Sequence, residues 1–241
     1  MPSRGCTLEI ARAVAACRHT GSVTGLGRCL RTGVAALATA GLLAAAAAAA
    51  VSSPGTAILT GIPQKGTVLG DPAAPLTLLQ YEDLGCEHCL EFMEAAFPAI
   101  VREYVRPGKL KVDFRGLGIV TPALEPALRY ALAAGRQNRL WQVVALYYEN
   151  QGRLNELADD AGVTRLVRGV KGLDVPRLLR DARSAAVTGQ IRAVVRESVA
   201  RKVEGTPWFL LRRGAGPVTR LAPEAYDAES FRMLLDEEFR R

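Results

Sequence analysis

The order of apolar and polar residues predicts a domain that mixes strands and helices. Residues 76–81 form a continuous apolar run with one glutamine, which is typical of a strand buried on both faces. Residues 110–114 alternate as a second central strand, and 67–69 is a short strand candidate. Apolar residues recur at helical spacing over about 87–104, so we expect an amphipathic helix there with a kink at Pro98.

A long helical region follows the second central strand. Five segments between about 122 and 203 carry helical patterns and are separated by glycines: 123–134, 139–148, 154–161, 175–182 and 186–202. Residues 208–211 and 218–221 then predict a β-hairpin. A final amphipathic helix is expected over about 227–240, burying Phe231, Leu234 and Leu235.

The first part of the chain has a different character. Residues 1–51 combine a basic lead with an uncharged, alanine-rich stretch at 32–51, and Arg28 and Arg31 stand just before that stretch. About 20 apolar residues can span a bilayer, and preceding arginines stay in the cytoplasm. We therefore expect the remainder to be extracytoplasmic, in the periplasm or cell envelope. The stretch fits a cleaved signal peptide or an uncleaved membrane anchor; a buried alanine-rich helix is a third, weaker reading.

Two further boundaries follow from composition. Residues 52–65 contain several glycines and prolines, so we expect a linker there and a folded domain over 66–241. The formal net charge of +7 does not point to nucleic acid as a partner. Five arginines and one glutamate give the first fifty residues +4, and the remaining +3 forms no basic patch with interleaved aromatic residues.

The cysteines carry the strongest chemical signal. Three of the five precede the apolar stretch, and beyond it the chain holds only Cys86 and Cys89, spaced as C-x-x-C. A disulfide-stapled scaffold would use several spaced pairs, whereas an oxidoreductase gains from having no other thiol. The pair begins a helix, where free N–H groups and the helix dipole stabilise a thiolate. We expect an exposed, attacking Cys86, a buried, resolving Cys89, and support for the thiolate from His88.

Two other readings of the pair compete with redox chemistry. A zinc half-site needs two more ligands, but the other histidine, His19, and the other cysteines all precede the apolar stretch. We therefore expect no metal. A structural disulfide stays open, although so short a loop restricts the unfolded chain very little.

A second motif, Gly205-Thr206-Pro207, directly precedes the strand that begins at Trp208. An X–Pro bond is the one peptide bond that becomes cis at low cost, but on its own such a tripeptide is common in turns. With C-x-x-C at the start of a helix after a buried strand, it resembles the thioredoxin superfamily. The helical region resembles its DsbA-like branch. The resemblance covers about 66–240 and rests on 81–86, Leu140-Trp141, 203–209 and the His88 position.

This resemblance implies an α/β thioredoxin-like fold, a central mixed sheet flanked by helices, with an all-helical subdomain inserted at about 122–203. It further implies that Cys86 forms the mixed disulfide with substrate and that Cys89 resolves it. Pro207 would be cis and packed against the disulfide, and the Thr206 backbone would pair with a bound peptide like an extra strand.

Two residues depart from the family pattern and bear on redox tuning. Glu87 stands where many relatives have proline or another neutral residue, and an anion there raises the pKa of the neighbouring thiolate. Gln80 stands where relatives often carry a buried glutamate that moves protons, and it cannot titrate. Glu87 would blunt the oxidising character, and both departures leave the oxidising strength open without changing the reaction class.

The resemblance implies an extracytoplasmic thiol–disulfide oxidoreductase without a cofactor. Its substrates would be exported polypeptides that contain cysteine, and a membrane redox partner would reoxidise or reduce it. Two alternatives remain: a reductase or isomerase of the same fold, and a non-catalytic, chaperone-like module that binds peptides. A module needs no low-pKa thiol, so the reactivity of Cys86 distinguishes it from an enzyme.

Overall fold

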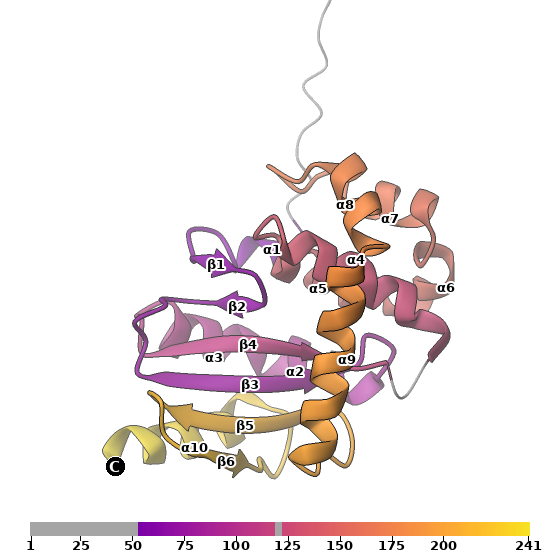
Figure 1. Cartoon of the computed structure of the whole chain (residues 1–241). Coiled ribbons are helices and arrows are strands. Elements are labelled where there is room, and N and C mark those ends of the chain that lie inside the picture. The colour runs from indigo at the N-terminus through magenta and orange to yellow at the C-terminus, as the bar shows by residue number, and fades with distance from the viewer. Residues whose placement is uncertain (1–52, 119–121) are drawn as a thin grey trace, which may run out of the picture. The chain divides into compact units, whose positions relative to one another are not determined.

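The computed structural model describes residues 53–118 and 122–241, whose strands form one mixed sheet. The strand order is β1-β2-β4-β3-β5-β6 (Figure 1). The strands are β1 (Gln64–Lys65), β2 (Val68–Leu69), β3 (Leu76–Glu82), β4 (Leu110–Gly116), β5 (Trp208–Arg213) and β6 (Val218–Leu221). Strands β3 and β4 are parallel, and the other adjacent pairs are antiparallel. This is the mixed central sheet that the sequence predicted.

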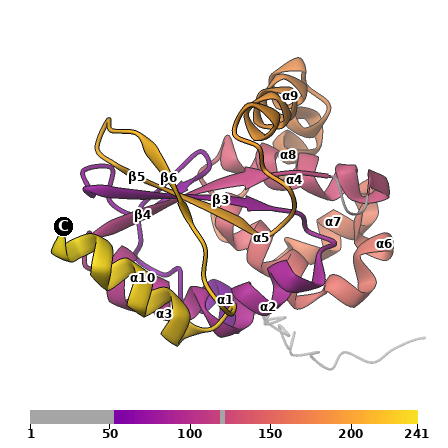
Figure 2. The ribbon, with the colours of Figure 1, turned by 90° about the horizontal axis from the view of Figure 1, so that it is seen from below.

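Helices cover both faces of the sheet. The connection from β3 to β4 runs through α2 (Glu87–Ala95), α3 (Phe97–Ile100) and the π-helix η1 (Val101–Val105). Figure 2 shows these elements on one face together with α10 (Ala228–Arg240), while α9 (Ala185–Ala200) lies over the other face. The cysteine pair that the sequence predicted as the redox site lies at the junction between β3 and α2.

The single helix expected over 87–104 is divided into three consecutive pieces. The first break falls at Ala96, two residues before Pro98. Proline has no N–H to donate, and its ring clashes with the carbonyl four residues earlier, so the helix cannot continue through it unchanged. The expected kink is present, slightly earlier along the chain than the proline itself.

The helical insertion lies between β4 and β5, as predicted. Its elements are η2 (Pro122–Leu124), α4 (Glu125–Gly135), α5 (Leu140–Glu149), η3 (Gln151–Arg153), α6 (Leu154–Leu157), α7 (Asp160–Leu166), α8 (Val175–Ala182) and α9. The expectation of a single helix over 154–161 was wrong, because the segment is divided between α6 and α7. Asp159 accepts a hydrogen bond from the backbone N–H of Gly162 at 2.6 Å, so it caps a new helix, α7.

The linker expected at 52–65 is also corrected over its described part. Residues 53–65 contain α1 (Pro54–Ala57) and β1, and Leu59 is only 2% exposed. The backbone N–H of Gly55 donates to Glu149 of α5 at 2.6 Å. Glycine and proline therefore mark turns within the domain here. The apolar stretch at 32–51 lies outside the described residues, and within those that are described no helix is long and apolar enough to cross a bilayer.

An aromatic cluster holds α2 against the sheet. Phe92 of α2 is fully buried, and its ring centroid lies 4.7 Å from that of Phe209 and 5.0 Å from that of Phe231. Phe97 stacks on Trp141 of α5, and the Trp141 indole N–H donates to the Thr67 carbonyl. Buried aromatic pairs add stabilisation beyond the area they remove from water. The cluster therefore fixes the helix that carries both cysteines.

The last helix differs from its prediction in one detail. Phe231 and Leu235 are fully buried, whereas Leu234 is only partly buried. Asp227 begins α10 by accepting a hydrogen bond from the N–H of Ser230.

Candidate active site

Cys86 and Cys89 lie where the central strand β3 passes into α2. The strand ends at Glu82, and the Asp83 side chain then accepts the N–H of Gly85 at 2.9 Å, which shapes the turn. Cys86 is the N-cap residue of α2, with extended backbone, and Cys89 lies in the first turn of the helix. Both thiols are free in this structure, so it represents the reduced state.

The two thiols differ in exposure less than the sequence suggested. Cys86 is 5% exposed and Cys89 is fully buried. The expectation of an openly exposed Cys86 was wrong, because the Thr206 loop covers it: the Cys86 thiol donates to the Thr206 carbonyl oxygen at 3.2 Å. The order of accessibility is still the expected one.

Their acidities, in contrast, differ strongly. The pKa of Cys86 is lowered to about 5, first because the Cys89 thiol donates a hydrogen bond to it. The Thr206 side chain and the backbone N–H groups of Cys89 and His88 lower it further, against a penalty from burial. Burial raises the pKa of Cys89, and the hydrogen bond to Cys86 raises it again. One sulfur is therefore a thiolate at neutral pH while the other keeps its proton.

Thr206 lies against Cys86, whose thiol donates to its carbonyl oxygen, and the packing of Pro207 against the cysteines stays a prediction. The Thr206–Pro207 peptide bond is cis. The Thr206 hydroxyl is buried and has no hydrogen-bond partner among the described residues. When Cys86 is protonated it donates to the Thr206 carbonyl, and once it ionises the hydroxyl can donate to the thiolate instead.

His88 and Glu87 lie on the solvent side of α2. The His88 side chain is 60% exposed, and its Nδ1 lies 3.4 Å from a Glu91 carboxylate oxygen. Its ring also faces Tyr226, with centroids 5.9 Å apart. The backbone N–H of His88 lowers the pKa of Cys86, and the role expected of the His88 side chain stays a prediction. Glu87 is exposed in the first turn of the helix.

An acidic residue that the sequence did not predict lies inside the site. Gln80 cannot titrate, but Glu82 lies two residues further along β3, on the same face, and is fully buried. The Gln80 amide and the Tyr148 hydroxyl donate to the Glu82 carboxylate, the latter at 3.1 Å. Burial nevertheless raises the pKa of Glu82 to about 8, and the Cys86 charge adds to this effect. The structure thus supplies a titratable carboxyl close to neutral pH.

The helical insertion contributes two residues to the site. Tyr148 of α5 is buried against Glu82 and also donates to the Asp83 carbonyl at 3.3 Å. The Gln151 amide donates to the carbonyls of Leu84 and Cys86, at 3.0 and 2.9 Å. Nothing in the sequence marked these two residues, because more than sixty positions separate each from its partners. For Glu82 there was a signal, a carboxylate directly following a buried strand.

Comparison with known proteins agrees with this arrangement. A family model described as Thioredoxin matches residues 63–235, which include both cysteines and Pro207. The chain belongs to the thioredoxin family. No curated protein matches it in sequence.

Solved structures of other proteins share the fold at low sequence identity. BdbD from Bacillus subtilis in its oxidised form is 16% identical, with a TM-score of 0.62, and the match covers 75% of this chain and 98% of that one. Alpha-DsbA1 from Wolbachia pipientis is 20% identical, with a TM-score of 0.60 over 71% and 89% of the two chains. DsbA2 from Pseudomonas aeruginosa is also 20% identical, with a TM-score of 0.52 over 74% and 96%. This chain therefore has a DsbA-like thioredoxin fold, including the helical insertion.

Proposed function

We propose that this member of the thioredoxin family is an extracytoplasmic thiol–disulfide oxidoreductase that forms or exchanges disulfides in exported polypeptides. The observation that carries the proposal is the contrast between the two thiols of one C-x-x-C pair. The pKa of Cys86 is lowered to about 5, and that of Cys89 is raised by burial. A structural disulfide or a peptide-binding module gains nothing from such a contrast, whereas exchange through a mixed disulfide depends on it.

In the oxidising direction the reaction begins with the Cys86–Cys89 disulfide. A substrate thiolate attacks Cys86, the S–S bond to Cys89 breaks, and Cys89 leaves as a thiolate that takes up a proton. A second substrate thiolate then attacks the substrate sulfur of the mixed disulfide, and Cys86 leaves as a stable thiolate. Two electrons pass from the substrate dithiol to the protein, so the substrate gains a disulfide and the protein becomes a dithiol.

Glu82 is the group that we propose to exchange the proton with Cys89. Cys89 is fully buried, so its proton cannot come directly from bulk water. The negative charge of Glu82 raises the pKa of Cys89, which places the two groups in electrostatic contact. A pKa of about 8 makes the Glu82 carboxyl a proton donor at neutral pH and an acceptor in the reverse direction.

The basic and apolar residues before the domain support the proposed cellular location and partners. The uncharged stretch at 32–51, with Arg28 and Arg31 ahead of it, supports export or anchoring with Cys86 outside the cytoplasm. The reduced enzyme then needs a membrane partner that removes two electrons. A reductase or isomerase uses the same residues, and its partner supplies electrons instead.

The test uses single serine substitutions in the full chain. In Cys89→Ser the mixed disulfide on Cys86 has no resolving thiol, so substrate adducts should accumulate on non-reducing gels. In Cys86→Ser adducts and turnover should both be absent. Equal trapping by both variants would contradict the assigned roles, and the absence of trapping in both, with the fold intact, would favour a binding module.

A further inference from the structure

An apolar groove runs beside the helix that carries the cysteines. It is a hollow of about 750 Å³ between α1, α2, α3 and α5, a size within the range of ligand sites. Its apolar wall includes Ile58, Leu90, Met93 and Phe97. Leu90 directly follows Cys89, and its N–H donates to the Cys86 carbonyl. The groove therefore begins within one helical turn of the dithiol.

The rim of this groove is acidic near the dithiol. Glu94 and Glu149 line it and are exposed, and Glu87 and Glu91 share the outward face of α2 with Glu94. None of these four carboxylates forms an ion pair with a lysine or arginine of residues 53–118 and 122–241. Arg102 also lines the groove, but it lies on η1, at the end away from the cysteines.

We infer that this groove receives a segment of the substrate polypeptide that carries apolar side chains and lysine or arginine next to the reacting cysteine. Apolar side chains would fill the groove, and the cationic groups would meet the carboxylates at its rim. Glu149 accepts the N–H of Gly55 and Glu91 lies beside His88, but none of the four has a lysine or arginine partner among the described residues. The inference rests on the proposed function, since it names the class of substrate sequence that the dithiol acts on. Acidic segments would be disfavoured by like charge.

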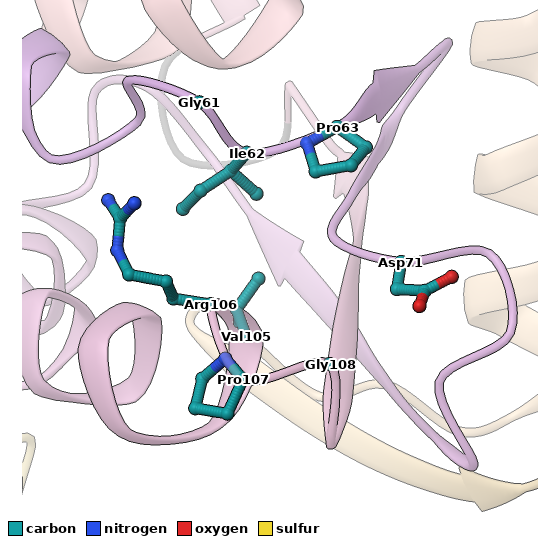
Figure 3. Close-up of a pocket in the computed structure, with 8 residues that line it drawn as sticks. All are labelled: Gly61, Ile62, Pro63, Asp71, Val105, Arg106, Pro107 and Gly108. Carbon is teal, nitrogen blue, oxygen red and sulfur yellow. The ribbon is translucent and has the colours of Figure 1, made fainter.

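A second hollow in the domain offers no comparable surface. It measures about 380 Å³, and Figure 3 shows Arg106 and Asp71 at opposite ends of its lining. The Arg106 guanidinium donates to the carbonyls of Ile58 and Thr60, and Asp71 accepts the N–H of Ala73. It is lined by one charged side chain of each sign, so it lacks the excess of carboxylates that lines the groove beside α2.

The experiment compares two-cysteine peptides as reductants of the oxidised full chain. One peptide has leucine, phenylalanine and lysine beside its cysteines, a second has glutamate for lysine, and a third has serine for the apolar residues. Each rate is divided by the rate of the same protein with dithiothreitol, an uncharged dithiol without side chains. We expect the apolar cationic peptide to react roughly tenfold faster than the apolar acidic one, and high salt to reduce that ratio.

Flanking charges also change the ionisation of the peptide's own thiols. The decisive quantity is therefore how far the ratio of the cationic to the acidic peptide's rate differs between wild type and variant. In the double variant Glu94→Gln/Glu149→Gln, the rate of the cationic peptide divided by that of the acidic peptide should fall. It should come close to the ratio that the ionisation of the peptides' own thiols produces. Glu237→Gln/Glu238→Gln on α10 removes the same charge elsewhere and should leave the ratio unchanged.

An equal ratio in wild type and the groove variant would overturn the inference, as would equal rates for the apolar and serine peptides. If dithiothreitol fails to reduce the disulfide as well, the proposed function itself fails. If dithiothreitol and all peptides react alike, only the groove assignment is lost.

Discussion

Replacing Glu82 with glutamine should stabilise the protein and impair its chemistry at the same time. Glutamine keeps the shape of the side chain and can still accept from the Tyr148 hydroxyl, but it cannot carry a charge. The wild-type carboxyl has its pKa raised from 4.5 to about 8 in the folded protein. Above pH 4.5 the unfolded chain therefore releases this proton more readily than the folded protein, and this difference lowers the free energy of unfolding.

The size and pH dependence of the effect follow from those two pKa values. At pH 7 the carboxyl is still largely protonated in the folded protein, whereas in the unfolded chain it is ionised. Each pH unit between the unfolded pKa of 4.5 and pH 7 costs about 1.4 kcal/mol, so this penalty lowers the wild-type free energy of unfolding by about 3 kcal/mol. It vanishes below pH 4.5 and reaches its full value above about pH 8. Glu82→Gln should therefore be more stable than wild type at pH 7 and equally stable at pH 4.

Urea denaturation of the reduced proteins at both pH values measures this directly, with Glu224→Gln at an exposed loop position as the matched control. Disulfide exchange by Glu82→Gln should slow by at least about tenfold near pH 7, because Cys89 loses its proton partner. A variant that is destabilised at pH 7, or equally stabilised at pH 4 and pH 7, would refute the assigned ionisation of Glu82. Unchanged exchange would refute its role in proton transfer.

Three further outcomes are expected. The Cys86 thiolate of the reduced protein should titrate near pH 5 by ultraviolet absorbance, and that step should be missing in Cys86→Ser. Glu87→Gln should lower the pKa of Cys86 further and make the disulfide more oxidising, as measured by equilibrium with glutathione. The shift in reduction potential should be no more than about 30 mV, because Glu87 is exposed, and a more reducing potential would contradict this prediction. Phe92→Ala should lower the free energy of unfolding by about 3–5 kcal/mol, measured in urea, because its ring is fully buried among other aromatic rings.

The local parts of the site could be predicted from the sequence, and the parts built by tertiary contacts could not. A buried strand followed by C-x-x-C, and a proline before a hairpin, are signals confined to a few residues. They place Cys86, Cys89 and Pro207 correctly in the thioredoxin order. The exposure of Cys86 could not be judged in this way, because the loop that covers it lies 120 residues away.

The buried acid illustrates the same limit. The apolar run at 76–81 made the strand seem to end at Tyr81, and the glutamate that follows it reads as the start of a turn. In the fold β3 extends through Glu82, and Tyr148 of the insertion buries it. Only the packing of α5 against the strand turns an ordinary polar residue into a titrating group.

The hydrogen bonds from Gln151 and Tyr148 to the turn before Cys86 have a consequence for protein engineering. The helical region is contiguous in sequence and resembles a module that could be cut out to leave a minimal domain. Removing it would leave the carbonyls of Leu84 and Cys86 without the Gln151 amide, and the carboxyl of Glu82 with the Gln80 amide but without the Tyr148 hydroxyl. A shortened chain could keep the sheet and still lose the geometry of its redox turn. Any miniaturised version must therefore replace those two donors before it removes the helices.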